Sequence, residues 1–218
     1  IPGETLGIIG ATGSGKSTLV SLIPRFYDVT SGIIKIGGVD IKNIDEKILR
    51  NKIALVPQET VLFTGSVLEN IRWGKEDASL EEVREAAQAA EVDEFISKFP
   101  EKYDTKLGQG GVNFSGGQKQ RVSIARALIK KPEVLILDDC TSAVDASTEV
   151  KIRKKLKKYS DNLTCIIIAQ KISSVMSADK IIVLDSGKLV GIGRHEEFIK
   201  NCQVYKDIFL SQVGREKL

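Results

Sequence analysis

A glycine-rich segment between residues 10 and 18, GATGSGKST, constrains this chain more than any other feature of its sequence. It matches the pattern G-x-x-x-x-G-K-[ST], which requires a buried strand before it and a helix after it. The apolar run Leu6–Gly10 precedes the pattern, and Ser17–Phe26 follows it as a helix that we expect to stop around Pro24. We therefore expect a strand, a phosphate-binding loop and a helix at the start of an α/β fold.

The residue types of this loop suit phosphate binding. Glycines let the backbone curl so that N–H groups point at phosphate oxygens, and the following helix adds the positive end of its dipole. Lys16 would bring a point charge to the β- and γ-phosphates, and the Ser17 hydroxyl would ligate Mg²⁺. The alternative, a chance Gly/Ser-rich turn, is disfavoured by the strand and helix on either side. The expected phosphate-binding set is Gly10, Thr12, Gly13, Ser14, Gly15, Lys16, Ser17 and Thr18.

Apolar runs alternate with helical spacing along the rest of the chain, which is typical of a mostly parallel sheet covered on both faces. Residues 79–99 and 116–130 have helical spacing and interrupt this alternation. We predict an α/β fold of the P-loop NTPase (RecA-like) class, with a mostly parallel sheet core in 1–73 and 131–218. An inserted α-helical subdomain would occupy about residues 74–130. The strand candidates are Ile53–Val56, Val134–Leu137, Cys165–Ala169 and Ile181–Leu184.

Composition limits the classes of function. The formal net charge of +3 lacks the basic excess of a nucleic-acid-binding surface, so no nucleic-acid partner is expected. No stretch reaches the roughly 18 apolar residues that span a bilayer. The cysteines form no C-x-x-C pair, and we expect reduced, buried thiols of a cytosolic protein at Cys140, Cys165 and Cys202.

A carboxylate pair follows the apolar run Val134–Leu137. Asp138, at the end of that predicted strand, could hold Mg²⁺ together with Ser17. A strand that ends in two aspartates would by itself more often be a turn, so the metal interpretation depends on the phosphate-binding loop.

Residues 114–128, FSGGQKQRVSIARAL, and 131–139, KPEVLILDD, resemble the signature motif and following strand of ATP-binding cassette (ABC) proteins. Further segments fall in the family's order, and the resemblance covers essentially the whole chain. They are Gln58 at the Q-loop position, LFTGS at 62–66 and ENI at 69–71 as in exporters, SAVD at 142–145 at the D-loop, and IIIA at 166–169 before the switch position.

The resemblance implies the nucleotide-binding domain of an ABC exporter, which binds ATP and Mg²⁺ and hydrolyses ATP at the cytoplasmic face of the cell (inner) membrane. Its implied partners are transmembrane helices of the exporter and a second ABC nucleotide-binding domain. In this family each ATP lies between one domain's P-loop and the other's signature. Gln58 would act at Mg²⁺ and in catalysis. The residues implied to contact nucleotide across the dimer are Ser115, Gly116, Gly117, Gln118 and Asp145. A glycine-rich helix start with a capping serine is the simpler alternative for the signature.

Two positions depart from the family pattern. Asp139 stands where a glutamate usually positions the attacking water, and its carboxylate falls about an ångström short. Gln170 stands where a histidine reaches the γ-phosphate, and glutamine cannot carry a positive charge. Both residues are still expected to be catalytic, but in a degenerate pocket that hydrolyses slowly. We therefore expect a heterodimer in which the intact signature of this chain completes a partner's site.

Other interpretations stay open at this point. An ABC ATPase of DNA maintenance would separate its P-loop from its signature by long coiled coils, and a translation factor would usually join two cassettes. A regulatory ATP-binding module without turnover is the other alternative. Because the family's adenine-stacking aromatic residue lies upstream of Ile1, we expect an N-terminally truncated fragment of a longer polypeptide.

Three minor features carry separate expectations. The basic run Lys151–Lys158 (KIRKKLKK) favours a solvated helix face, with contact to anionic lipid or a partner as the alternative. His195 is expected to be structural. Trp73 is expected to be buried.

Overall fold

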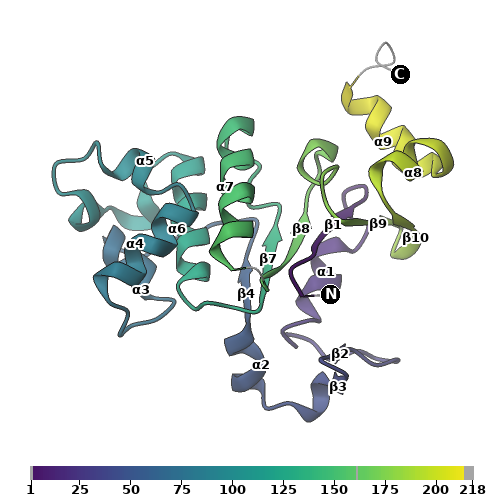
Figure 1. Ribbon diagram of the computed structural model, residues 1–218, viewed down its shortest axis with the longest axis horizontal. Coiled ribbons are helices and arrows are strands. Elements are labelled where there is room, and N and C mark those ends of the chain that lie inside the picture. The colour runs from purple at the N-terminus through teal and green to yellow at the C-terminus, as the bar shows by residue number, and fades with distance from the viewer. Residues whose placement is uncertain (1, 161, 214–218) are drawn as a thin grey trace. The chain divides into compact units, whose positions relative to one another are not determined.

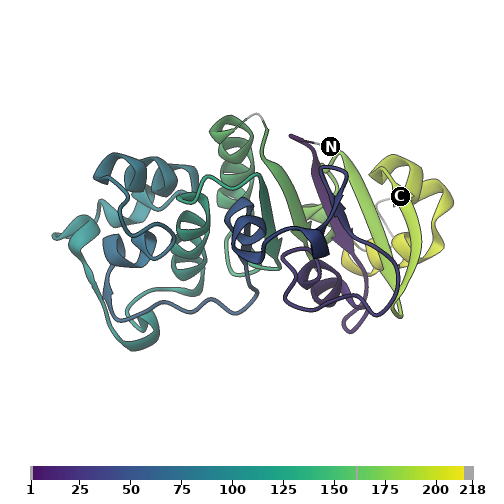
Figure 2. The same ribbon diagram turned by 90° about the horizontal axis from the view of Figure 1, so that it is seen from below.

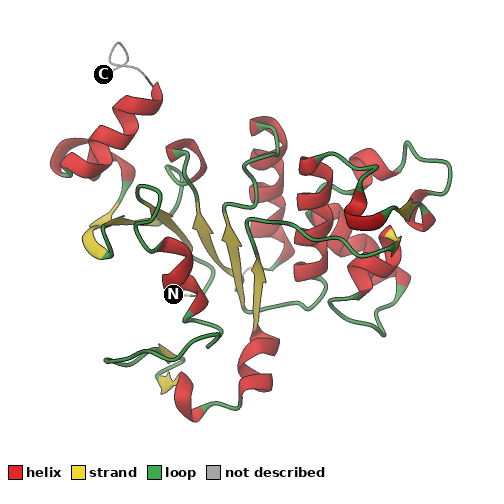
Figure 3. Ribbon diagram, turned by 180° about the vertical axis from the view of Figure 1, so that it is seen from behind, coloured by secondary structure: helices red, strands yellow, loops and turns green. Residues whose placement is uncertain are grey.

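The computed structural model describes residues 2–160 and 162–213, and the chain divides into two compact units (Figure 1). The first unit comprises residues 3–53 and 164–218, and the second comprises 54–163. The predicted helical subdomain of about 74–130 falls within the second unit, and its separate status stays a prediction. The described residues combine helices and strands (Figure 3), as the sequence predicts for an α/β fold.

The first unit is built around strand β1, which lies between β8 and β9 and runs parallel to both (Figure 2). Leu6 of β1 pairs with Ile166 of β8 on one side and with Lys180 of β9 on the other. Strand β10 extends the sheet as an antiparallel neighbour of β9. The mostly parallel arrangement is therefore confirmed. The elements of this unit are β1 (Thr5–Ile9), α1 (Lys16–Ser21), β2 (Lys35–Ile36), β3 (Val39–Asp40), α2 (Glu46–Lys52), β8 (Thr164–Ile168), β9 (Lys180–Asp185), β10 (Lys188–Gly193), α8 (His195–Asn201) and α9 (Gln203–Val213).

The second unit combines strands with a series of helices. Strand β7 is a neighbour of β4, which begins at Ile53 at the end of the first unit. Its elements are β4 (Ile53–Val56), β5 (Gly65–Ser66), α3 (Val67–Arg72), α4 (Leu80–Ala89), α5 (Asp93–Ile96), β6 (Lys106–Leu107), α6 (Gly116–Leu128), β7 (Val134–Asp138) and α7 (Ala146–Tyr159). The spacing that predicts α4 is borne out, because Val83, Ala86 and Ala87 form its buried side.

Serine side chains fix the start of three helices in the second unit. Ser66, Ser79 and Ser115 each accept a hydrogen bond from the backbone N–H three residues later. In each case the residue at that later position is Glu or Gln, and its side chain accepts a hydrogen bond from the backbone N–H of the serine. The two reciprocal bonds form a capping box. The helix that begins within the signature, α6, therefore starts where the sequence places its capping serine.

Two predicted helices are too long. The helix expected from Ser17 and stopped around Pro24 already ends at Ser21, and Arg25 beyond it adopts φ +56°. The helix expected over 79–99 is divided into α4 and α5, and Glu91 adopts φ +58° between them. A side-chain pattern does not reveal such left-handed residues.

The minor expectations have different outcomes. All three cysteines are buried as predicted, and none forms a disulfide among the described residues. His195 starts α8, and its Nδ1 lies 2.8 Å from the hydroxyl of the fully buried Tyr205, which supports a structural role. Trp73 is 62% exposed and stacks on Phe63 with 4.2 Å between ring centroids, so the expectation that it is buried is wrong. Among the described residues, no helix combines the length and apolar character needed to cross a bilayer.

Candidate nucleotide-binding site

The loop between β1 and α1 is curled by glycines in the left-handed region. Gly13 and Gly15 adopt φ +79° and +92°. Such left-handed conformations cost any residue other than glycine about 1–2 kcal/mol. The Ser14 N–H donates to the Ala11 carbonyl at 3.1 Å, which closes a tight turn. A Cβ added at Gly13 would find no atom of the described residues within 4 Å. The loop is therefore tightly folded and open on the Gly13 side.

Gly10 marks a close approach between this loop and β9. A Cβ at this position would lie 2.1 Å from the Leu184 carbonyl oxygen and 2.6 Å from the Ser14 Oγ. Both distances are well below contact distance, so only glycine fits. The first glycine of the motif thus seats the loop on the end of the sheet.

Lys16 is held inside the curl of the loop. Its Nζ donates to the carbonyl oxygens of Gly10 at 2.9 Å and Ala11 at 2.8 Å, and it lies 3.4 Å from the Ser14 Oγ. The residue is only 8% exposed. A phosphate group in this loop would therefore meet a positive charge that is already positioned, in surroundings that screen it poorly.

The start of α1 can receive an anion. Its N-cap is Gly15, and no side chain caps the helix there. The first helical hydrogen bond runs from the Leu19 N–H to the Gly15 carbonyl, and the exposed Ser17 and Thr18 lie between them. N–H groups of a first helical turn are suited to phosphate oxygens. The residues present thus fit the phosphates of ATP, and the exposed Ser17 hydroxyl fits the chemistry of a Mg²⁺ ligand.

Gln170 also lies in the first unit, two residues after β8. Its carbonyl accepts a hydrogen bond from the Gln212 Nε2 at 2.7 Å, and the Ile172 N–H donates to the Gln212 Oε1 at 2.8 Å. One side-chain amide of α9 therefore holds the backbone on both sides of residue 171. Sequence reasoning missed Gln212, because nothing in its surroundings indicates a contact 42 residues away.

The carboxylate pair lies in the second unit at the end of β7. Asp138 and Asp139 are each 9% exposed. Asp139 adopts φ +45°, a region sparsely populated by non-glycine residues, and such backbone strain clusters at functional sites. Burial raises the pKa of the neighbouring Cys140 thiol, so this side chain stays neutral between the carboxylates and the core.

The signature residues form the N-terminus of α6 in the second unit. The Ser115 Oγ accepts from the Gln118 N–H at 3.3 Å, and the Ser115 N–H donates to the Gln118 Oε1 at 2.9 Å. The Ser115 hydroxyl can still donate its own proton to a phosphate oxygen. The simpler interpretation, a capping serine at a glycine-rich helix start, is thus correct as a description of the isolated chain, and it is compatible with anion binding.

The signature helix packs against the D-loop segment of the same unit. A Cβ at Gly117 would lie 2.7 Å from the Ala143 carbonyl oxygen, and the Ala143 N–H donates to the Gln120 Oε1 at 3.2 Å. Gly116 approaches the Ala143 Cβ, at 3.3 Å for an added Cβ. The glycines of this motif therefore serve close packing on one side in addition to any ligand contact on the other.

Asp145 caps α7. Its carboxylate accepts hydrogen bonds from the Ser147 hydroxyl at 2.6 Å and the Thr148 N–H at 2.9 Å. These hydrogen bonds, the one from Ser147 first, lower the pKa of Asp145 well below its usual range.

Gln58 lies exposed in the loop after β4.

The predicted site residues are thus distributed over both units. The phosphate-binding loop and Gln170 belong to the first, and Gln58, Asp138, Asp139, Asp145 and residues 115–118 belong to the second. The structure brings together Gly10, Ser14 and Lys16 within the loop, and it holds the signature against the D-loop segment. The roles of all these residues in nucleotide chemistry stay predictions.

Comparison with known proteins gives the family. The family profile described as ABC transporter matches residues 1–142. The uncharacterized ABC transporter ATP-binding protein YfiB of Bacillus subtilis (strain 168) is 53% identical over 215 residues, which are 99% of this chain and 37% of that protein. Human ATP-binding cassette sub-family B member 6 is 45% identical over 217 residues, covering 100% of this chain and 26% of that protein.

A solved structure agrees with these relatives. The structure of a bacterial Atm1-family ABC exporter with ATP bound superimposes with a TM-score of 0.93 and 39% sequence identity, covering 97% of this chain and 37% of that one. The chain thus spans 26–37% of the length of these proteins. A family profile that matches most of the chain and this agreement in sequence and fold lead to one conclusion: the chain belongs to the ABC transporter family.

Proposed function

We propose that this chain is the ATP-binding and ATP-hydrolysing domain of an ABC exporter, acting at the cytoplasmic face of the membrane. The geometry of the phosphate-binding loop carries this proposal, because Lys16 is buried within a loop whose glycines are required by φ and by close approach. Similarity to an exporter whose structure has ATP bound supports ATP as the ligand. Transmembrane helices of the exporter would be the first partner.

A second nucleotide-binding domain would be the other partner. The loop from Gly10 to Thr18 would hold the phosphates, and Ser115 to Gln118 of the opposite domain would cover the γ-phosphate. Lys16 would supply the charge, and Ser17, Gln58 and Asp138 would hold Mg²⁺, which when bound would neutralise phosphate charge. The rigid packing of the signature on Ala143 supports a preformed surface for that second domain.

The proposal includes an asymmetric pair of sites. Asp139 has a carboxylate one methylene shorter than glutamate, and its backbone is held at φ +45° with only 9% exposure. A carboxylate fixed in this way cannot shift easily to recover the missing reach. Gln170 has its carbonyl bonded by Gln212, and its side chain can donate a hydrogen bond but carries no charge. These residues support slow hydrolysis in this chain's own pocket and normal hydrolysis in the pocket its signature completes.

Four forms of the chain test the asymmetry: the unmodified chain, Asp139→Glu, Gln170→His and the double variant. Their ATPase rates are measured with the isolated chain at high protein concentration, so that like chains can pair. We expect the double variant to exceed the unmodified chain by about 10²-fold, since a misplaced or missing general base costs about that much or more. An unmodified chain that already hydrolyses as fast as the double variant would contradict the asymmetry and leave ATP binding unaffected.

The partner provides the complementary test. With a second nucleotide-binding domain present, Ser115→Arg in this chain should abolish most of the hydrolysis, whereas Asp139→Asn should remove little. If the mixed pair shows no hydrolysis and the double variant restores none, the regulatory ATP-binding module becomes the better interpretation.

A further inference from the structure

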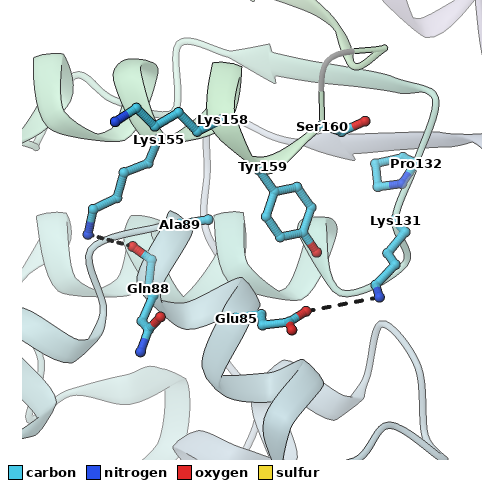
Figure 4. Close-up of a pocket in the computed structure, with 9 residues that line it drawn as sticks. All are labelled: Glu85, Gln88, Ala89, Lys131, Pro132, Lys155, Lys158, Tyr159 and Ser160. Carbon is cyan, nitrogen blue, oxygen red and sulfur yellow. Dashed lines mark hydrogen bonds and ion pairs between the residues drawn. The ribbon is translucent and has the colours of Figure 1, made fainter.

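The second unit contains a cavity of about 630 Å³ formed by α4, α7 and the segment after α6 (Figure 4). Its size lies within the roughly 300–1,000 Å³ of small-molecule sites. All of its lining residues belong to one compact unit, and none belongs to the phosphate-binding loop, the signature or the carboxylate pair. The proposed ATPase chemistry therefore leaves this cavity without a role.

The lining of the cavity is basic. Lys131, Lys155 and Lys158 line it together with one acidic residue, Glu85. Figure 4 shows Lys155 and Lys131 on opposite sides of the Tyr159 ring, with Glu85 across from it. Glu91 pairs with Lys155 from outside the lining, so three ammonium groups stand against two carboxylates and leave an excess of one positive charge.

These lysines are tied to the protein to different degrees. Lys155 donates to the Gln88 carbonyl at 2.9 Å and pairs with Glu91 at 2.9 Å. The Lys131–Glu85 distance is 4.0 Å and both side chains are more than half exposed, so this pair contributes little. The Lys158 side chain forms no hydrogen bond or ion pair with another residue in the described part of the chain. It extends past Lys155 and away from the Tyr159 ring and Lys131 (Figure 4), so the Lys131 and Lys158 ammonium groups must both swing toward the ring to share a ligand. Neither breaks a strong contact in doing so.

The helix geometry explains why the basic run produces this site. Lys151, Lys155 and Lys158 follow at intervals of four and three residues, so they share one face of α7. The first two pair with glutamates of the same unit, Lys151 with Glu94 at 3.9 Å and Lys155 with Glu91. Lys158, one turn further, lines the cavity instead. The predicted solvated face is confirmed, because Ile152 and Leu156 are buried and Lys151, Lys154, Lys157 and Lys158 are exposed; Lys158 also lines the cavity.

The cavity also has an apolar wall. It includes Ala89, Pro132 and the ring of Tyr159. The Tyr159 hydroxyl donates to the Leu128 carbonyl at 3.0 Å, and burial raises its pKa to about 12, so it stays neutral. Tyr159 thus offers a ring face and no charge.

We propose that this cavity binds a small phosphorylated anion through Lys131 and Lys158, with the Tyr159 ring beside it. Lysines are compact point charges that suit phosphate oxygens. Because Glu85 also lines the cavity, a ligand with one negative charge would gain little, whereas a group with two or more charges outweighs the carboxylate. A soluble phosphate ester and a phospholipid headgroup share this chemistry.

Inorganic pyrophosphate is the probe, added to the 218-residue chain carrying Lys16→Ala so that the phosphate-binding loop does not compete. We expect saturable amide ¹H–¹⁵N shifts confined to residues near 85–89, 131 and 155–160. Lys158→Ala should weaken the apparent affinity about three- to fivefold, and Lys131→Ala should do the same, as for loss of one partly exposed ionic contact. The matched control is Lys157→Ala, on the same helix but outside the cavity, which should change the affinity less than twofold.

Three results would overturn the proposal: no saturable shifts, shifts elsewhere, or equal effects of Lys157→Ala and Lys158→Ala. Thermal unfolding of each variant verifies that it is folded. Because Lys16 is already removed, failure here leaves the proposed ATPase function untouched.

Vesicles distinguish the two sources of phosphate. Binding is compared on phosphatidylcholine vesicles with and without phosphatidic acid. Binding to anionic vesicles that requires Lys158 and is displaced by pyrophosphate identifies a headgroup, and pyrophosphate shifts without vesicle binding identify a soluble ligand. Vesicle binding that depends equally on Lys154, Lys157 and Lys158, and that pyrophosphate does not displace, would contradict the cavity site and indicate a diffuse basic surface.

Discussion

Removal of the side-chain amide of Gln212 should loosen the segment that carries Gln170. The amide donates to the Gln170 carbonyl at 2.7 Å and accepts from the Ile172 N–H at 2.8 Å. A typical hydrogen bond contributes about 0.5–1.5 kcal/mol net, and an exposed side chain such as this one stays at the lower end. We therefore expect Gln212→Ala to lower the free energy of unfolding by about 1 kcal/mol, or the melting temperature by roughly 2–4 °C.

Hydrogen exchange locates this effect. The Ile172 amide should exchange about five- to tenfold faster in Gln212→Ala, because its acceptor is gone. Gln203→Ala is the matched control: it removes the same side chain from α9, where Gln203 bonds only Asp207 on its own helix among the contacts described. Equal loss of stability in both variants, or an unchanged Ile172 exchange rate, would refute the role given to Gln212.

Three further predictions concern other parts of the chain. Gly10→Ala should destabilise the chain by about 1–3 kcal/mol in thermal unfolding, since its Cβ would lie 2.1 Å from the Leu184 carbonyl, and an unchanged melting temperature would contradict this. Because hydrogen bonding from Ser147 lowers the pKa of Asp145, the stabilising effect of this carboxylate is present above its ordinary pKa and is lost as the pH falls through the lowered value. The stability difference between the unmodified chain and Asp145→Ala should therefore be constant above about pH 5 and narrow progressively below about 3.9; a constant difference would refute the cap. Because the three thiols are buried, iodoacetamide should label none of them in the native chain and all of them after unfolding: Cys140, Cys165 and Cys202. Rapid labelling of the native chain would contradict this burial.

The strands and the start of the signature helix were predictable because each is encoded locally. β4 has the predicted bounds, and β7 ends one residue later than predicted. β8 begins and ends one residue earlier than predicted, and β9 is one residue longer at each end. Continuous apolar runs mark such buried parallel strands. The start of α6 follows from Ser115 and Gln118, whose reciprocal hydrogen bonds are a property of four consecutive residues.

The rest depends on features that a single sequence does not carry. Glu91 adopts left-handed backbone without being glycine, so the break between α4 and α5 could not be placed from the sequence. The Gln212 contact joins residues 42 positions apart. Trp73 was expected to be buried, but its ring is 62% exposed and only one face stacks on Phe63. The residue type alone does not reveal this arrangement. In the site, the curl of the loop followed from its glycines, whereas the strained φ of Asp139 did not follow from its residue type.

The central claim is that the loop around Lys16 binds the phosphates of Mg-ATP, and calorimetric titration of the 218-residue chain with Mg-ATP tests it most directly. We predict saturable binding that Lys16→Ala weakens by about 10- to 100-fold, as for loss of a charge-assisted hydrogen bond, whereas the exposed Lys200→Ala on α8 retains it. Absence of binding by the folded, unmodified chain, or equal binding by Lys16→Ala, would contradict the account.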